Sequence, residues 1–211
     1  MKIKILIMAA LFYSFSYSAE SISKIVKEIQ QTYEKINNLT ADFSQMEQFN
    51  LTGTQNETRG KIYVKGGIKF RLETEDQTVV TDGKTVWTYS VMNNQVLVDR
   101  VKEGEGSLLP RDLLFKYPRD YYATLLEETK IGGEKYYLIK LDPKEGVQGY
   151  IKTMKMRVHA KSYIISRIEY TDFNNNISIL EIRQADTTIN LPDSLFIFKP
   201  APEMQVVDLR M

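Results

Sequence analysis

Residues 60–73 read GKIYVKGGIKFRLE, and apolar side chains alternate with polar ones on both sides of the glycine pair. In the first half Ile62 and Val64 occupy alternate positions, and in the second half Phe70 and Leu72 do the same. Because a β-strand points successive side chains to opposite faces, each half predicts a strand with one apolar face. Two glycines between such strands favour a tight turn, so the stretch predicts an antiparallel hairpin.

The same alternation recurs along most of the chain. It predicts about eleven strands, at residues 40–49, 54–65, 68–75, 78–81, 85–90, 95–100, 127–131, 136–142, 150–158, 163–171 and 177–185. Turn signals such as Asp82-Gly83 separate many of them. Tight turns join neighbouring antiparallel strands, and a twisted sheet with one apolar face must curl around something apolar.

Two parts of the chain have helical spacing instead. Residues 21–35 predict an amphipathic helix whose apolar stripe consists of Ile22, Ile25, Val26, Ile29, Tyr33 and Ile36. Between residues 104 and 126 the period changes again, and Pro110 with four nearby leucines predicts one or two short helices. We expect this insert to cover an open edge or mouth of the sheet. Residues 191–198 are a candidate for a last short strand.

Residues 1–18 have the features of a signal peptide. Two lysines precede a short apolar run, and the small residues Ser16 and Ser18 stand at the expected positions before Ala19. The apolar run is too short to span a bilayer. We therefore expect residues 19–211 to form a single secreted domain.

The composition argues against several classes of protein. Its 28 lysines and arginines are balanced by 27 aspartates and glutamates, whereas a nucleic-acid-binding protein usually carries a basic excess. Cysteine is absent, which excludes disulfides, a thiolate nucleophile and a cysteine-bound metal. A secreted domain without disulfides fits a bacterial periplasm better than a eukaryotic exterior. We expect a periplasmic monomer with no nucleic-acid partner.

Residues for catalysis or metal binding do not form a recognisable set. His159 is the one histidine, at a predicted strand end where a surface or turn position is the usual explanation. Acidic residues are spread singly over strands and turns, so no metal site is predicted. Residues 83–85, Gly-Lys-Thr, lack the upstream glycine and the following helix of a phosphate-binding loop. With no nucleophile beside a base, the sequence indicates a binding protein without a cofactor rather than an enzyme.

Several segments, in order, carry a resemblance to a known family. They are residues 42–45 (DFSQ), 60–72, 81–89 (TDGKTVWTY), 141–144 (LDPK) and the ending 196–208. In these segments, and in its order of leader, helix, strands and mid-chain helices, the chain resembles the outer-membrane lipoprotein carrier protein (LolA) family. The resemblance extends over essentially the whole chain after the leader.

The resemblance implies a fold and a function. The fold would be an unclosed antiparallel β-barrel with an α-helical lid over a hydrophobic cavity. The function would be that of a periplasmic chaperone, which takes acylated lipoproteins from an inner-membrane lipoprotein-releasing ABC transporter. It would then deliver them to the outer membrane, to a lipoprotein receptor where one is present.

Candidate cavity and lid residues come from the apolar faces together with the resemblance. For the acyl cavity we propose Phe70 and Leu72, followed by Phe43, Ile62, Val64 and Trp87. For the inner surface of the lid we propose Ile25, Ile29, Leu109, Leu113 and Leu114. Each of these side chains could equally belong to an ordinary core. Phe70 is the first choice because it matches a cavity position of the family.

The chain departs from the family at residues 66–67. The family commonly has an Arg-Pro pair there, whose arginine helps to hold the lid closed, and this chain has two glycines. Lys65, Lys69 or Arg71 could take over that role. The cavity itself is not affected by the difference.

Two other functions remain open. A lipid- or glycolipid-binding module of the same fold would carry a different amphiphile. An enzyme acting on envelope polymers would need an acid/base pair facing a polar cleft.

Overall fold

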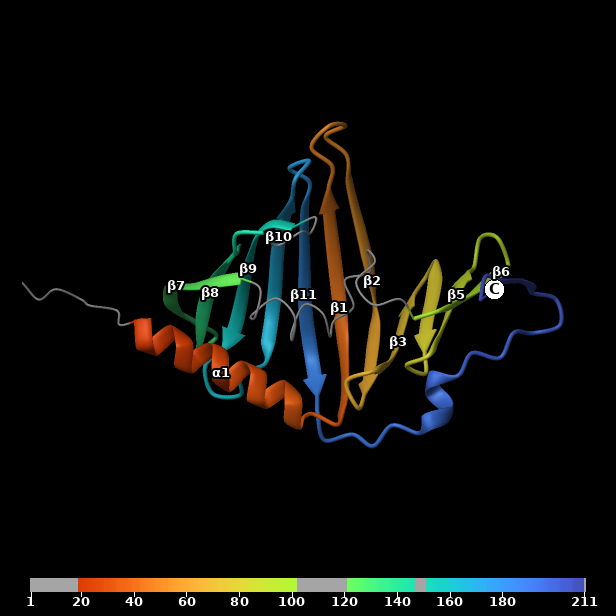
Figure 1. The fold of residues 1–211 in the computed structure, drawn as a ribbon, viewed down its shortest axis with the longest axis horizontal. Helices are drawn as coiled ribbons and strands as arrows, with labels where there is room; N and C mark the ends of the chain where they lie inside the picture. The colour runs from red at the N-terminus through yellow and green to blue at the C-terminus, as the bar shows by residue number, and fades with distance from the viewer. Residues whose placement is uncertain (1–18, 102–120, 147–150, 211) are drawn as a thin grey trace, which may run out of the picture.

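The computed structural model describes residues 19–101, 121–146 and 151–210 (Figure 1). Its elements are α1 Ala19–Lys35, β1 Asn38–Gln48, β2 Gln55–Lys65, β3 Lys69–Thr74, β4 Gln77–Thr81, β5 Thr85–Ser90, β6 Gln95–Arg100, β7 Tyr121–Ile131, β8 Glu134–Pro143, β9 Ile151–His159, β10 Ile165–Asp172, β11 Ile177–Asp186, the 3-10 helix η2 Asp193–Phe196 and β12 Gln205–Asp208. All strands join one sheet in the order β12-β6-β5-β4-β3-β2-β1-β11-β10-β9-β8-β7. The end strands β12 and β7 do not pair with each other, so the sheet is open.

This arrangement confirms the predicted fold class. Every strand pair is antiparallel except β12 with β6, which is parallel. The sheet has 12 strands rather than about eleven, because β12 was not expected. Of the predicted helical lid, α1 is present. The predicted helical stretch 104–126 lies outside the described residues up to residue 120, and residues 121–126 form part of strand β7 instead.

One face of the sheet is apolar from strand to strand, because the register aligns the apolar positions. Ala41 pairs with Ile62, Ile62 with Leu72, and Phe43 with Ile182. We call the face that carries these residues the inner face. It continues across β10, β9 and β8 through Ile168, Met156 and Ile139.

Helix α1 packs on one part of the inner face. Its residues Ile25, Ile29 and Tyr33 are buried in one cluster with apolar side chains of β7, β8, β9 and β10. In Figure 1 the helix accordingly lies across this end of the sheet. The predicted amphipathic stripe is therefore the surface by which α1 binds the sheet, and Ile25 and Ile29 lie on it.

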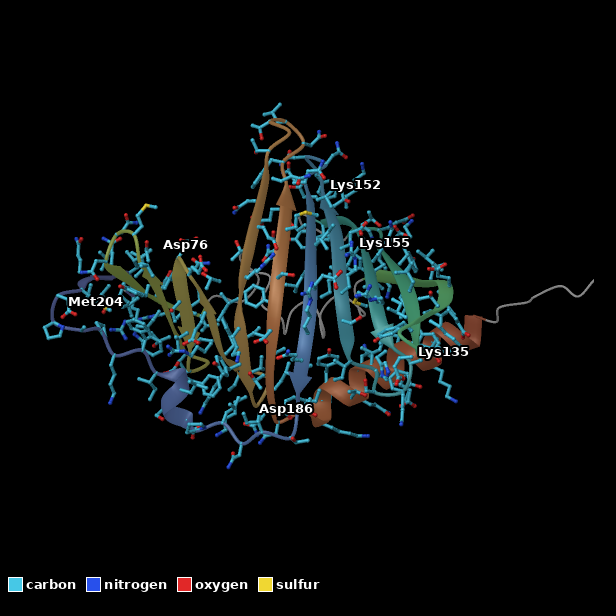
Figure 2. All side chains as sticks on the ribbon, turned by 180° about the vertical axis from the view of Figure 1, so that it is seen from behind. Asp76, Lys135, Lys152, Lys155, Asp186 and Met204 are labelled. Carbon is cyan, nitrogen blue, oxygen red and sulfur yellow. The ribbon has the colours of Figure 1, made fainter. Side chains whose placement is uncertain are left out.

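The opposite, outer face is largely charged over β8, β9, β10 and β11. Arg157 bonds to Glu181 at 2.9 Å and Lys155 to Glu169 at 3.4 Å, each between strands of the sheet. Figure 2 views the molecule from behind and labels Lys155 among these side chains. Partly exposed ion pairs contribute little to stability. Because charged side chains occupy the outer face of these strands, the apolar inner face is the one that other parts of the protein must cover.

The C-terminal segment covers the outer face at the other end of the sheet. Lys65 donates to the carbonyl of Leu191 at 2.7 Å, and Lys69 donates to the carboxylate of Asp193 at 3.0 Å. Hydrogen bonds from Lys69 and Lys65 hold the pKa of Asp193 below its usual value. Phe196, at the end of η2, is fully buried.

These contacts correct the expectation for residues 191–198 and show what the basic residues beside the glycine pair bind. Residues 191–198 do not form a strand, because the segment turns through η2 to lie against β3. Lys65, Lys69 and Arg71 point to the outer face, where Arg71 also reaches the carbonyl of Leu195. They bind the C-terminal segment, and α1 lies on the opposite face.

Local backbone geometry explains two features of the sheet, the course of β7 and the turn between β2 and β3. Strand β7 begins at Tyr121 rather than at residue 127, and a bulge between Leu125 and Glu127 interrupts its alternation. The turn between β2 and β3 has positive φ at both Gly66 (58°) and Gly67 (68°). Proline fixes φ near −65°, so an Arg-Pro pair could not form this turn.

Gly60 marks the closest packing in the central strands. It lies opposite Phe43 on the inner face. A Cβ built on Gly60 would lie 2.0 Å from the carbonyl oxygen of Glu73 and 2.9 Å from the Phe43 ring. The Phe43 ring therefore lies over a position that only glycine can occupy.

Replacing Gly60 by alanine should therefore lower the free energy of unfolding by about 2–3 kcal/mol, because the backbone of β3 must move. Urea unfolding with an unchanged m-value measures the loss. The matched control is Gly53→Asn, in an open turn where asparagine tolerates positive φ, and it should change stability by less than about 0.5 kcal/mol. Equal stability of Gly60→Ala and the wild type would contradict this packing.

Candidate functional site

An apolar pocket lies on the inner face beside the C-terminal end of α1. It has a volume of about 110 Å³. Its lining comprises Tyr33, Leu39, Ala41, Phe43, Gln45, Ile62, Leu72, Ile164, Ile165, Ile168, Leu180, Ile182 and Ala185. These residues come from α1, from strands β1, β2, β3, β10 and β11, and from the turn before β10. Apolar side chains dominate the lining, so the pocket suits a hydrocarbon group.

The pocket forms where two apolar clusters meet. One contains α1 and β7–β10, and the other is centred on Ala41, Phe43 and Ile62. Leu180 of β11 packs against both. Small side chains at Ala41 and Ala185 leave space between the clusters, and the described helix does not extend over β1–β3.

Tyr33 fixes the end of α1 to the pocket wall. Its hydroxyl accepts a hydrogen bond from the backbone N–H of Ile165 at 3.0 Å. Burial raises the pKa of Tyr33 to about 12, and the hydrogen bond from Ile165 opposes part of that rise. The phenol is thus neutral at physiological pH and serves as a buried anchor between α1 and β10.

Three of the six predicted cavity residues line the pocket, namely Phe43, Ile62 and Leu72. Val64 and Phe70 pair with each other on the same inner face, next to the pocket but outside its lining. The binding of acyl chains by these residues stays a prediction.

Trp87 lies elsewhere, which corrects its assignment. It pairs with Val80, and Val80 pairs with Arg71, so Trp87 lies on the outer face. That face also holds the C-terminal segment, where Tyr89 and Phe198 have ring centroids 5.7 Å apart. Trp87 therefore cannot share a cavity with Phe70.

The lid residues divide between described and undescribed parts of the chain. Ile25 and Ile29 of α1 are buried against the inner face. Leu109, Leu113 and Leu114 lie outside the described residues. The pocket also includes residues that were not candidate site residues, namely Tyr33, Leu39, Ala41, Gln45, Ile164, Ile165, Ile168, Leu180, Ile182 and Ala185. Of these, Leu180 and Ile182 reach the pocket because β11 pairs with β1 and places them opposite Gln45 and Phe43.

A serine, a histidine and a glutamate do meet, although the sequence analysis identified no such set. His159 Nδ1 lies 2.9 Å from Ser162 Oγ, and its Nε2 lies 3.2 Å from Glu134 Oε2. However, His159 Nδ1 also accepts the backbone N–H of Ser162 at 3.1 Å, so the imidazole closes the turn between β9 and β10. None of the three lines the pocket.

Metal and membrane features can be assessed only for the residues outside the gaps at 1–18, 102–120, 147–150 and 211. Among those residues, no three side chains of histidine, aspartate or glutamate gather in a way that could hold a metal ion. None of the helices there combines the length and the hydropathy needed to cross a bilayer.

The fold is an open, mainly antiparallel sheet that carries a helix and an apolar pocket on one face. Solved structures share this fold: a conserved uncharacterized protein of Thermus thermophilus superposes with a TM-score of 0.60 at 15% identity, covering 89% of this chain and 99% of that one. MucB superposes with a TM-score of 0.54 at 15% identity, over 90% of this chain and 66% of MucB.

The sequence places the chain in a particular family. The profile of the family described as outer membrane lipoprotein carrier protein LolA matches residues 34–199, and the chain belongs to that family. The outer-membrane lipoprotein carrier protein of Haemophilus influenzae is 27% identical over 193 residues, covering 90% of each chain. An uncharacterized protein of Methanocaldococcus jannaschii is 22% identical over 201 residues, and the chain spans only 57% of its length.

Replacing Tyr33 by phenylalanine should lower the free energy of unfolding by about 1–3 kcal/mol near pH 7, because the buried N–H of Ile165 loses its acceptor. The pH dependence should change as well. A tyrosine whose pKa rises from 10.0 to about 12 on folding stabilises the protein below pH 10, and this contribution disappears as the pH rises toward 12.

Wild-type protein should therefore lose about 2–3 kcal/mol more than the variant between pH 10 and 12. Urea unfolding across this range measures the difference. Tyr122→Phe is the control, since Tyr122 is 61% exposed and should behave like wild type. Parallel pH profiles for wild type and Tyr33→Phe would show that Tyr33 is not the buried anchor.

Proposed function

We propose that this protein is a periplasmic carrier that shields the acyl chains of lipoproteins from water. It would take them from an inner-membrane lipoprotein-releasing ABC transporter and carry them to the outer membrane. The observation that carries the proposal is the apolar pocket between α1 and strands β1–β3, β10 and β11. Membership of the LolA family and the lipoprotein carrier of Haemophilus influenzae, 27% identical, support this cargo.

The driving force for binding would be hydrophobic. Each methylene removed from water contributes roughly 0.8 kcal/mol, so even part of an acyl chain gives useful affinity. The lining has few polar groups that could recognise a particular headgroup; Gln45 and Tyr33 are the main ones. A carrier of this kind would select the hydrocarbon and accept many attached proteins. It would release its cargo to any site that covers the chains better.

The size of the pocket implies that binding requires an opening of the protein. A volume of 110 Å³ is below the roughly 150 Å³ of an engineered cavity that admits benzene. A full acyl chain therefore needs more room than the described conformation offers. The simplest source of room is a displacement of α1, which would expose the inner-face side chains now packed against Ile25 and Ile29.

In this proposal the helix acts as a lid whose closing competes with cargo. The buried cluster beneath α1 and the hydrogen bond from Ile165 to Tyr33 favour the closed state. An acyl chain favours the open state because it replaces the same contacts. Since the two states bury similar apolar surface, loading and release could proceed without a covalent step or ATP at this protein.

A tryptophan at Ile182 tests the pocket directly. Ile182 lines the pocket, and the larger ring should fill it. Displacing two or more methylenes of a ligand at about 0.8 kcal/mol each should weaken binding of a fluorescent fatty-acyl probe about tenfold or more. Titration of the probe into the purified protein measures the change.

The matched control is Ile179→Trp. Ile179 lies on the same strand β11 but pairs with Met46 and Glu169 on the outer face. Its replacement should leave probe affinity unchanged, and circular dichroism should confirm that both variants are folded. Equal affinities of the two variants for the probe would refute the pocket as the acyl site.

The identity of the cargo separates the carrier from the alternative with the same fold. Protein isolated from periplasm under mild conditions should carry polypeptides with an acylated N-terminal cysteine, and mass spectrometry identifies them. Free lipid or glycolipid alone would support the lipid-binding module instead. Depletion of the carrier should leave lipoproteins in the inner membrane.

A further inference from the structure

Two turns at one end of the sheet expose large apolar side chains to water. Leu51, in the turn between β1 and β2, is 96% exposed, and Phe49 beside it is 41% exposed. Phe173, in the turn between β10 and β11, is 64% exposed. Figure 1 shows these two turns next to each other, projecting beyond the other described parts of the sheet. We call residues 49–54 and 173–176 together the apolar tip.

Hydrogen bonds hold the apolar tip in one arrangement. In the first turn, Gly53 donates to the carbonyl of Phe49 at 2.8 Å. In the second, Asp172 accepts the backbone N–H of Asn176 at 2.8 Å. The backbone N–H of Asn50 donates to the side-chain oxygen of Asn176 at 3.0 Å and so joins the two turns. These bonds connect the backbones of the two turns from which the exposed apolar side chains project.

The chemistry around the tip fits a membrane surface. Residues 49–54 read FNLTGT and residues 173–176 read FNNN, so the tip itself carries no charge. Lys152 lies next to it and donates to the side-chain oxygen of Asn175 at 3.0 Å (Figure 2). The carboxylate of Asp172 at the base of the second turn is bonded to N–H groups of Asn174 and Asn176, so Lys152 is the charged group beside the tip that can meet anionic headgroups.

The shape of the tip also favours a bilayer over a protein groove. Its two turns project beyond the rest of the described sheet, and its apolar side chains are exposed to water (Figure 1). A bilayer accepts such a projection without a matching pocket.

The tip is connected to the pocket through β1. The alternation that places Phe43 in the pocket, continued along the strand, places Phe49 on the same inner face. Six residues of strand separate them by about 20 Å. A protein resting on its tip would therefore hold the pocket about 20 Å from the lipid surface.

We propose that the apolar tip docks this protein on lipid bilayers, with Leu51, Phe49 and Phe173 entering the interface and Lys152 facing lipid phosphates. This inference goes beyond the proposed carrier function, since it assigns membrane contact to the chain itself.

Flotation of the purified protein with vesicles of phosphatidylethanolamine and phosphatidylglycerol tests the proposal. Wild-type protein should float with the vesicles. The affinity of the double variant Leu51→Ser/Phe173→Ser for the vesicles should fall about tenfold or more, because two large apolar side chains no longer enter the interface. Both sites are exposed, so the variant should keep its fold, which circular dichroism verifies.

Met92→Ser is the matched control. Met92 is 90% exposed in the turn between β5 and β6, outside the tip. This variant should bind vesicles like wild type. Absence of wild-type flotation, or an equal loss for Met92→Ser and the double variant, would overturn the tip as a docking site.

Binding of the fatty-acyl probe distinguishes the docking proposal from the carrier proposal. The double variant should bind the probe with wild-type affinity, because neither substituted residue lines the pocket. Probe binding without vesicle binding by the wild type would refute docking and leave the carrier function intact. Vesicle binding through the tip without probe binding would support docking and refute the acyl pocket.

Discussion

The inner face of the sheet is apolar over more strands than its helix can cover. Helix α1 has 17 residues, so it is about 25 Å long. With strands about 4.8 Å apart, a helix lying across them spans roughly five. Its cluster accordingly reaches β7, β8, β9 and β10. The apolar face of β1, β2 and β3 extends beyond the helix, and the pocket lies at this boundary.

The two ends of the sheet are covered on opposite faces, so the pocket and the contacts of the C-terminal segment lie on different sides of the sheet. At one end α1 covers the inner face, while the C-terminal segment covers the outer face of β2 and β3 through Lys65, Lys69 and Arg71. A displacement of α1 would leave the contacts of the C-terminal segment in place. The sheet can thus stay folded while one of its covers moves.

Much of the fold could be predicted because its signals are local. The alternation in β2 and β3 and the paired glycines between them specify a hairpin without reference to the rest of the chain. The stripe of α1 likewise identifies the helix and its buried side. The local alternation within strands also explains why Phe43, Ile62 and Leu72 are correctly expected on one apolar face.

The face on which Trp87 lies could not be predicted because β5 gives no local signal. Its sequence, TVWTYS, has Val86 on one side and Trp87 and Tyr89 on the other, so both faces carry apolar side chains. The pairing of Trp87 with Val80 and Val98 decides the matter, and it places the indole on the outer face. Strand pairing is non-local, and alternation within one strand cannot reveal it.

Patterns among neighbouring residues specify most of the strands and the position of α1, and ordered motifs specify the family, although β12 and the first half of β7 were not expected. The pairing of β11 with β1, which brings Leu180 and Ile182 to Phe43, is visible only in the folded protein. The tertiary structure alone placed the turn of Phe173 beside that of Leu51. Both outcomes depend on contacts between segments more than 100 residues apart, which a pattern of period two does not encode.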